Sequence, residues 1–397
     1  MKIKHMKFLD KYAGYAACVV LTAFGRAFGS GEPAKIDKGA IRKVLVMKFW
    51  GLGSILLLSP AIAGIREEFP GARIVLFTSR RNSEICSSLG IFDEVRYLDV
   101  DRGWLAFAAS LLRNMFRLFM DRFDMVVDFE FFTRFSAVLT FFTFSPIRVG
   151  YHAWEAWRGD IHNIKVPFNR YWNIMDNFYN LGTYIGVAAR PELRMARPRF
   201  TEEDRAFVDG LLGKAGVSGG YIAANVNASD LVIERRWPYE NFVELARRLL
   251  EKFGSSIVFV GSPSERPGVD AIVKEVGDPR AVNLAGMVSI PQLARLFEGA
   301  DLVISNDSGP LHLAVAMGTP TVSLFGPETP AIYGPKGKEH TVIFKNIDCS
   351  PCCNVHDRKS VHCYWEKPRC MSLITVAEVF EAIERALSGP AAARGRR

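Results

Sequence analysis

The chain has 397 residues, of which 49% are hydrophobic and 23% charged. This composition is ordinary for a globular protein and excludes disorder as its main character, while the length suits two domains. Fifty Lys and Arg against 42 Asp and Glu give a net charge of +8, which favours partners with phosphate or carboxylate groups. No recognised nucleic-acid-binding module accompanies this charge, so we expect no nucleic acid partner.

Residues 1–40 predict an N-terminal amphipathic helix. Large apolar residues recur near helical spacing from Phe8 to Phe28, with Lys11 and Arg26 beside them. The apolar run from Tyr12 to Phe24 is shorter than the about 20 residues that a membrane-spanning helix needs. Two interpretations remain open: a helix lying on an anionic membrane surface, or a helix packed on the domain that follows.

Short apolar runs alternate with helix-like segments over residues 41–200. This alternation is typical of βαβ units and predicts a doubly wound parallel sheet. The expected strands are Val44 to Phe49, Ile74 to Phe77, Val95 to Leu98 and Met125 to Phe129. The expected helices are Leu56 to Glu68, Trp104 to Asp121 and Phe135 to Phe142.

The stretch Arg190 to Phe200 is rich in Pro and Arg, and we interpret it, with the helix-like segment Asn173 to Gly186 before it, as the passage between two domains. A second doubly wound domain is expected over residues 201–388, and a disordered basic tail over 389–397. The expected strands are Tyr221 to Asn225, Ile257 to Val260, Ala281 to Leu284, Leu302 to Ser305 and Thr321 to Phe325. The expected helices are Glu240 to Lys252, Gly268 to Val276, Pro291 to Glu298, Pro310 to Met317 and Val376 to Leu387.

The fold class is therefore α/β, with two Rossmann-like domains and a cleft expected between them. Ligands of such sheets bind at the carboxyl ends of the strands.

The most informative segment lies at the fourth strand of the second domain, where Ser308-Gly309-Pro310 begins a helix. Proline suits the first helical position, and the free amides of a helix start hold a diphosphate without a metal. His312 lies one turn further on, on the same face as Ser308. Asp307 either caps this helix or accepts a sugar hydroxyl. The alternative is a well-capped helix, with Asp307 and Ser308 as caps and His312 as a buried polar residue.

Two other loops bring polar side chains to the same edge. One carries Asn227 and Ser229, followed by Arg235 and Arg236, whose guanidinium groups suit phosphate. The other carries Glu265, which we expect to accept hydrogen bonds from a ribose or an adenine amine.

The segment Asn306 to His312, followed by Gly318-Thr319-Pro320 and Leu324-Phe325-Gly326-Pro327, resembles the donor-site signature of glycosyltransferase family 9, the ADP-heptose:lipopolysaccharide heptosyltransferases. Arg236-Trp237-Pro238 resembles its basic-Trp-Pro element. The resemblance implies a GT-B fold with the acceptor on the first domain and the nucleotide sugar, ADP-heptose, on the second. It places the donor contacts on Ser229, Arg236, Glu265, Asp307, Ser308, Gly309 and His312.

The loop after the first strand is similar to the family's opening segment and gives candidate acceptor contacts. These are Lys48, Trp50, Gly51 and Gly53. The family carries an aspartate, thought to be the catalytic base, at the position that Ser54 occupies here. A serine hydroxyl does not take a proton near neutral pH unaided, so the base must come from elsewhere.

We predict Glu130 as the base, with Asp128 second, because both close the fourth strand at the carboxyl edge. The alternative for both is a cap of the helix that follows.

The expected reaction is a single inverting displacement that requires no metal or other cofactor, with a lipid-linked glycan as acceptor. Asp99-Val100-Asp101 has the form of a metal-nucleotide motif, but its place before a helix indicates a turn. Arg113, Arg117 and Arg122 either meet phosphates of the acceptor or form a solvated helix face. The rival function is a non-catalytic nucleotide-sugar-binding or envelope-assembly protein that has lost the base.

Five of the seven cysteines fall in one segment, residues 349–370. This clustering indicates that they act together locally, in a protein kept in a reducing compartment. One Cys-x2-Cys pair and the nearby His356 and His362 make structural zinc one interpretation; a disulfide or packed thiols is the other. The cysteines are Cys349, Cys352, Cys353, Cys363 and Cys370.

The expected location is the cytoplasm, peripheral to the inner face of the cytoplasmic membrane.

Overall fold

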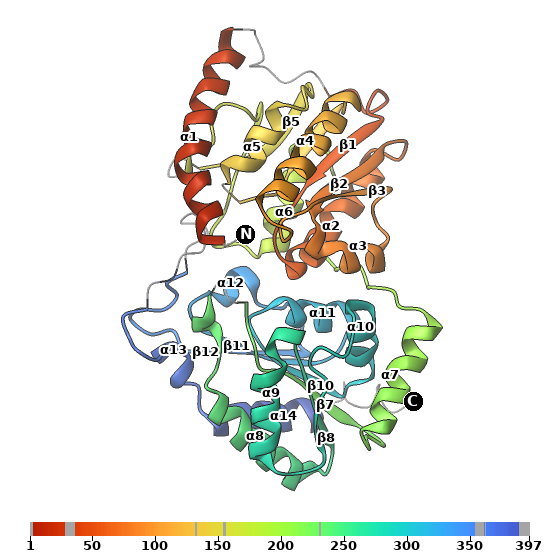
Figure 1. The fold of residues 1–397 in the computed structure, drawn as a ribbon, viewed down its shortest axis with the longest axis vertical. Helices are drawn as coiled ribbons and strands as arrows, with labels where there is room; N and C mark the ends of the chain where they lie inside the picture. Colours follow the sequence, from red (N-terminus) through yellow and green to blue (C-terminus); the bar gives the residue numbers. More distant parts are fainter. Residues whose placement is uncertain are drawn as a thin grey trace. The chain divides into compact units, whose positions relative to one another are not determined.

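The structure is a computed structural model that describes residues 3–27, 36–131, 133–153, 156–229, 232–353, 361 and 363–388. It divides into two compact units, with unit 1 ending at Met195 and unit 2 beginning at Ala196. Each unit contains a six-stranded sheet (Figure 1). The tail at 389–397, which we expect to be disordered, lies outside the described residues.

The sheet of unit 1 has the order β3-β2-β1-β4-β5-β6, and every pair in it is parallel. Its four inner strands are largely apolar and buried because helices cover both faces of such a sheet, whereas the edge strands are partly exposed. The four predicted strands are present, whereas β5 and β6 were not predicted. The strands are β1 (Lys43–Met47), β2 (Arg73–Ser79), β3 (Glu94–Leu98), β4 (Met125–Asp128), β5 (Ile147–His152) and β6 (Ile164–Pro167).

The helices of unit 1 include one that sequence reasoning placed wrongly. Helix α6 was interpreted as part of the passage between domains, but it packs against α2. Its buried residues Ile174, Phe178 and Leu181 make it part of the core of unit 1. Helix α3 was not predicted. The helices are α1 (Ile3–Ala27), α2 (Leu52–Glu68), α3 (Ser83–Leu89), α4 (Trp104–Met120), α5 (Arg134–Phe141) and α6 (Ile174–Thr183).

Helix α1 packs against α5, as one of the two interpretations of the N-terminal segment predicted. Cys18 and Thr22 are buried in this contact. Asp10 Oδ1 accepts a hydrogen bond of 2.7 Å from the amide of Phe135, in the first turn of α5. None of the described helices is both long and apolar enough to cross a bilayer.

The sheet of unit 2 has the order β12-β11-β10-β7-β8-β9, with every pair parallel. Counted from the first strand of each unit, both sheets therefore have the same order, and the doubly wound prediction is confirmed for both. Strand β12 was not predicted. The strands are β7 (Tyr221–Asn225), β8 (Ser256–Val260), β9 (Ala281–Asn283), β10 (Leu302–Asn306), β11 (Thr321–Phe325) and β12 (His340–Phe344).

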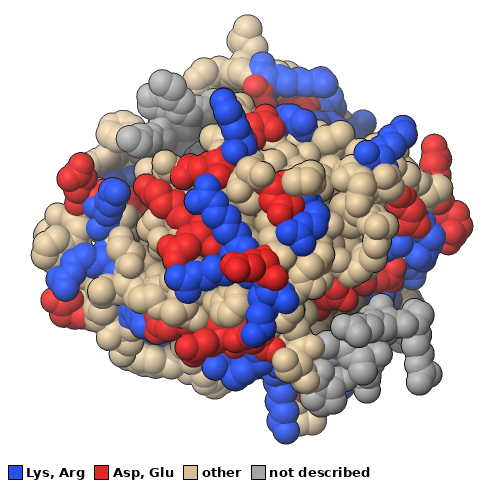
Figure 2. All heavy atoms as spheres, turned by 90° about the horizontal axis from the view of Figure 1, so that it is seen from below, with Lys and Arg blue, Asp and Glu red and all other residues tan. Residues whose placement is uncertain are grey.

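The helices of unit 2 present a polar outer surface. Figure 2 shows acidic and basic side chains interspersed over the face seen from below in Figure 1. Pairs one helical turn apart, Arg248 with Glu244 and Arg385 with Glu381, contribute to this pattern. Helix α7 was not predicted. The helices are α7 (Glu202–Lys214), α8 (Tyr239–Phe253), α9 (Arg266–Val276), α10 (Ile290–Gly299), α11 (Gly309–Met317), α12 (Pro330–Tyr333), α13 (Arg369–Ser372) and α14 (Val376–Ser388).

Each sheet reverses its strand order beside its first strand, between β1 and β4 in unit 1 and between β7 and β10 in unit 2. The carboxyl end of such a switch point is where open α/β sheets bind ligands. The two candidate sites described next lie at these two points.

Candidate functional site

At the switch point of unit 2, helix α11 begins at Gly309 directly after β10, as predicted, with Pro310 in its first turn. Ser308 is the N-cap residue, but its side chain makes no capping hydrogen bond. Ser308, Gly309 and Pro310 are partly exposed. The first turn of a helix carries amide donors without intrahelical partners and a partial positive charge. This helix start is thus a candidate anion site.

Asn225, the last residue of β7, explains why Ser308 does not cap the helix. Its side-chain amide donates to Ser308 Oγ at 2.8 Å, to Ser305 Oγ at 3.0 Å and to the Asn227 carbonyl at 3.1 Å. The hydroxyl of Ser308 is thereby held toward β7. The alternative of a helix capped by Ser308 is wrong, and sequence reasoning missed Asn225 because it is an ordinary strand-end residue.

Asp307 does not cap the helix either, because it pairs with a buried arginine. Arg235 Nε lies 3.2 Å from Asp307 Oδ2, and Arg235 Nη2 lies 3.3 Å from Oε2 of the fully buried Glu328. Burial by itself lowers the pKa of the Arg235 guanidinium, but the two carboxylates raise it well above its usual value. Arg235 therefore stays charged beside the start of α11. Glu328 was missed, although it directly follows the Gly326-Pro327 of the quoted signature.

The other predicted donor residues lie on the same edge but differ in what they do. Arg236 donates from Nε and Nη2 to the carbonyl of Ala228, so it ties its own loop together. Glu265 accepts from the amide and the hydroxyl of Ser262 and completes a capping box. His312 is buried, with its ring 6.5 Å from that of Tyr333.

The loops that carry these residues are anchored to the core. Trp237, in the predicted basic-Trp-Pro element, donates from its amide to Asn306 Oδ1 at 3.1 Å and from its indole to the Ile374 carbonyl at 2.9 Å. Asn227 is partly buried and Ser229 exposed on the loop after β7. Because β7 and β8 are neighbours, the loop with Glu265 lies at the same edge.

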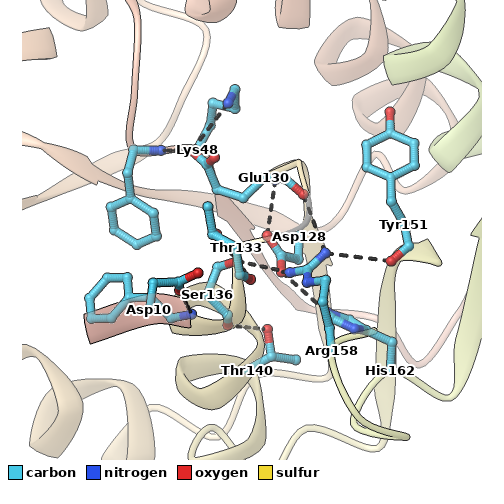
Figure 3. A network of polar contacts seen from close by, with 12 residues as sticks. Asp10, Lys48, Asp128, Glu130, Thr133, Ser136, Thr140, Tyr151, Arg158 and His162 are labelled. Carbon is cyan, nitrogen blue, oxygen red and sulfur yellow. Dashed lines mark hydrogen bonds and ion pairs between the residues drawn. The ribbon is translucent and has the colours of Figure 1, made fainter. Parts of the chain in front are cut away.

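At the switch point of unit 1, Glu130 fills the loop after β1 (Figure 3). Its Oε1 accepts from Lys48 Nζ at 3.1 Å, from the Phe49 amide at 2.5 Å and from the Trp50 amide at 3.2 Å. Lys48 is 1% exposed and Glu130 2%. The carboxylate of Glu130 therefore accepts hydrogen bonds from the backbone amides of the loop that precedes α2.

Asp128 lies beneath Glu130 and is fully buried. Its carboxylate pairs with Arg158, accepts from the Glu130 amide at 3.0 Å and lies 3.2 Å from His162 Nε2 (Figure 3). Burial by itself raises the pKa of Asp128, but Arg158 and His162 outweigh it and hold that pKa below its usual value. Burial lowers the pKa of His162 to about 4, so this imidazole is neutral near pH 7.

Arg158 connects this network to the surrounding chain. Its guanidinium also donates to Ser136 Oγ at 2.8 Å and to the carbonyls of Glu130 and Tyr151. Sequence reasoning missed both Arg158 and His162, because the loop between β5 and β6 shows no motif. Only the folded sheet brings them to Asp128.

The structure constrains the predicted roles in unit 1. The alternative that Asp128 and Glu130 cap the following helix is wrong, since Thr133 is the N-cap residue of α5. With both carboxylates buried, the geometry favours a positioning role, and the assignment of a base stays a prediction.

The predicted acceptor contacts on the loop after β1 differ in exposure. Lys48 points inward, over the ring of Phe131 at 4.5 Å. Gly51 is exposed, with φ of +91°, a backbone conformation that favours glycine, while Trp50 is partly buried and Gly53 is buried. Ser54 lies in the first turn of α2 and is partly buried.

Asp99 and Asp101, which have the spacing of a metal-nucleotide motif, form ion pairs with Arg80 and Arg81 at the end of β2. Neither caps the helix that follows, since Gly103 is the N-cap residue of α4. Within the described part of the chain, no group of three or more His, Cys, Asp or Glu side chains is arranged to hold a metal ion.

The cysteine segment separates into two environments. Cys349, Cys352, Cys363 and Cys370 line one small pocket, while Cys353 lies 4.0 Å from Arg235. All five are free thiols, so the disulfide interpretation is wrong for this structure. Burial raises the pKa of the Cys370 thiol to about 11. Structural zinc stays a prediction, and His356 and His362 lie outside the described residues.

Comparison with known proteins identifies the family. The family model described as Glycosyltransferase family 9 (heptosyltransferase) matches residues 112–362, which is more than half of the chain. The chain belongs to glycosyltransferase family 9. It is therefore a glycosyltransferase, and the resemblance stated from its motifs is confirmed.

Among curated relatives, this glycosyltransferase is 22% identical to the lipopolysaccharide core heptosyltransferase OpsX of Haemophilus influenzae over 77% of its own length and 84% of that protein. It is 23% identical to lipopolysaccharide heptosyltransferase 1 of Escherichia coli K12, over 76% of its length and 92% of that protein.

Among solved structures, a family 9 glycosyltransferase from Veillonella parvula superposes with a TM-score of 0.71 at 22% identity, covering 87% of this chain and 97% of that one. The E. coli heptosyltransferase WaaC with ADP superposes with a TM-score of 0.63 at 21% identity, covering 87% and 99%. These superpositions confirm the two-domain GT-B fold.

Proposed function

We propose that this glycosyltransferase moves a heptose from ADP-heptose to a lipopolysaccharide core or another lipid-linked cell-surface glycan, at the inner face of the cytoplasmic membrane. The names of the relatives, which include lipopolysaccharide heptosyltransferases and a structure with ADP, support the donor and acceptor classes. The uncapped start of α11, with its partly exposed Ser308 and Gly309, is the observation that carries the proposal.

The diphosphate of the donor binds at this helix start in the proposed site. The amides of Ser308 and Gly309 and the positive end of α11 accept the charge that grows on the departing diphosphate. Arg235 stays charged nearby, and His312 lies one turn further along α11. Asn227, Ser229, Arg236 and Glu265 surround the nucleotide and its sugar in this proposal.

The proposed reaction is a single displacement with inversion at the anomeric carbon, and it requires no metal. The acceptor hydroxyl, held by the loop at Trp50, Gly51 and Gly53, loses its proton to a carboxylate as it attacks. We propose Glu130 as this base ahead of Asp128, because Glu130 contacts the loop assigned to the acceptor, whereas Arg158 and His162 enclose Asp128.

A transfer assay with ADP-, UDP- and GDP-sugars tests the proposal. We expect turnover with an ADP-sugar, an inverted anomeric configuration in the product and an unchanged rate in EDTA. Binding of ADP without turnover for any donor would instead support the non-catalytic function that Ser54 suggests. Retention of configuration would contradict the single displacement.

The variant Glu130→Gln tests the base separately. If Glu130 takes the proton, the rate falls by about 100-fold and the acidic limb of the pH–rate profile disappears. A lower rate with the same pH profile would assign Glu130 to holding the loop at Phe49 and Trp50.

A further inference from the structure

Helix α4 presents a wide apolar face that no described part of the chain covers. The side chains on it are exposed by 49% to 89%, and they repeat at intervals of about one or two helical turns. Its opposite face, with Leu118, packs on the sheet of unit 1. The exposed residues are Trp104, Leu105, Leu112, Phe116, Phe119 and Met120.

Helix α1 has a second face of the same kind. While Cys18 and Thr22 face α5, the apolar residues that the sequence predicts are exposed by 44% to 66%, although Tyr15 lies beside Trp157 and Phe24 beside Phe141. Helix α1 is thus amphipathic with apolar residues exposed to solvent. Soluble monomers seldom expose a contiguous apolar patch of this kind. These apolar residues are Phe8, Tyr12, Tyr15, Val19, Val20 and Phe24.

The two faces join through aromatic side chains at the end of α5. The ring of Phe24 on α1 lies 6.1 Å from that of Phe141 on α5. Phe141 lies 6.0 Å from Phe144, which lies 5.6 Å from Phe119 on α4. The helices therefore share one apolar surface, which we call the α1–α4 surface.

Basic residues predominate among the charges of these two helices. Helix α4 contains no Asp or Glu and carries the exposed Arg113 and Arg117. The only acidic residue in α1 is Asp10, and its carboxylate bonds to α5. Lys11 is exposed beside Tyr12, with its ammonium 5.3 Å from the ring centroid. Arg113 Nη2 also lies 3.9 Å from the Asp99 carboxylate. An apolar surface with these exposed cations is complementary to an anionic lipid surface.

We propose that the α1–α4 surface, formed by the exposed apolar residues of α1 and α4 with Phe144, docks on anionic phospholipid. The apolar side chains enter the boundary between headgroups and acyl chains, and Arg113, Arg117 and Lys11 contact lipid phosphates. The inference specifies the membrane contact in the proposed function, and it rests on that function only for the lipid-linked nature of the acceptor.

Vesicle flotation with the full-length protein, in the absence of donor and acceptor, tests the surface. We expect binding to phosphatidylcholine vesicles that contain phosphatidylglycerol and weaker binding to phosphatidylcholine alone. The double variant Leu112→Ser, Phe116→Ser lowers the vesicle affinity by about tenfold or more. The double variant Arg113→Gln, Arg117→Gln lowers it by about fivefold per residue, and only for anionic vesicles.

The matched control is Phe207→Ser with Leu373→Ser, two exposed apolar residues of unit 2, which leaves vesicle affinity unchanged. Equal thermal melting of all variants shows that they fold. Lack of vesicle binding, or equal binding by the α4 double variant, overturns the proposal. A concentration-dependent dimer in sedimentation that the α4 variant abolishes, without vesicle binding, assigns the surface to a second copy. Vesicle binding without sugar transfer would count against the proposed function alone.

Discussion

The two switch points have the same topology but differ in what occupies their backbone amides. In unit 1 the amides of Phe49 and Trp50 donate to the carboxylate of Glu130, which also pairs with Lys48. In unit 2 the start of α11 has no side-chain cap, and Asn225 holds the hydroxyl of Ser308 away from it. The start of α2 also has no side-chain cap, so the difference lies in the loop before it, whose amides donate to a buried carboxylate. We call the site of unit 1 closed and that of unit 2 open.

This difference supports the proposal that unit 2 takes the diphosphate. An anion-binding loop that already holds a buried carboxylate repels a second anion, whereas an uncapped helix start attracts one. The fold alone does not make this distinction, since both units have it.

Removing the cation of the closed site has the largest expected effect. Lys48→Met leaves Glu130 buried without its ion-pair partner, and we expect a loss of about 3–5 kcal/mol in the free energy of unfolding. Urea denaturation followed by circular dichroism measures it. The control is Lys345→Met, which breaks the partly exposed pair with Glu378 and costs about 1 kcal/mol or less. Equal effects of the two variants would show that the Lys48 pair does not stabilise unit 1.

The closed site also predicts a dependence of stability on pH. His162 titrates near pH 6.5 in the unfolded chain but has a pKa of about 4 when folded, so the unfolded state binds the extra proton between these values. Stability therefore falls as the pH drops from 6.5 to 4, by about 3 kcal/mol from this residue.

The variant His162→Asn isolates this contribution from that of other histidines. We expect a shallower decline of the melting temperature between pH 6.5 and 4 than in the wild type. The lowered pKa of Asp128 acts only below its usual value of 3.8, outside this window. If the melting temperatures of the two proteins fell in parallel with pH, the result would contradict a buried neutral imidazole at His162.

Placing an anion at the open site should make it resemble the closed one. Ser308→Asp introduces a carboxylate at the N-cap of α11, and we expect ADP affinity to fall by about 100-fold because the carboxylate takes the amides. Calorimetric titration measures this, with Ser308→Ala as the matched variant of small effect. Aspartate is a favourable N-cap, so the melting temperature should not fall. Undiminished ADP binding in Ser308→Asp would place the diphosphate elsewhere.

The smallest effect is expected from the residue that keeps the open site uncapped. Asn225→Ala frees the hydroxyl of Ser308 to turn toward the amides of α11, and ADP affinity should fall by about fivefold, the worth of one hydrogen bond. The same titration measures it. An affinity equal to that of the wild type would show that Asn225 does not preorganise the site.

The start of α11 was predictable because its determinants are neighbours in the chain. A buried strand, a helix-starting Gly309-Pro310 and a periodic apolar helix follow one another directly. The parallel pairing within each sheet was also predictable, since alternating strands and helices favour it. Helix α6, by contrast, was assigned to the interdomain passage because its sequence does not show that it packs on α2.

The state of each site depended on contacts between distant residues. Arg158 reaches Asp128 over 30 positions, and Arg235 reaches Glu328 over 93. The local sequence reveals neither pair, because a charged residue on a loop has the same sequence neighbours whether its side chain is solvated or buried. Thus the sequence predicted where ligands and side chains would converge, but not which of them would already be paired.

The sequence by itself determined the two doubly wound units, the helix start at Gly309 and the apolar stripe of α1, because these follow from periodicity and from the backbone preferences of Gly and Pro. Only the tertiary structure decided that Glu130 closes one loop and that Asn225 leaves the other open. The physical reason is that burial and pairing set the charge a site presents, and both depend on residues that only folding brings together.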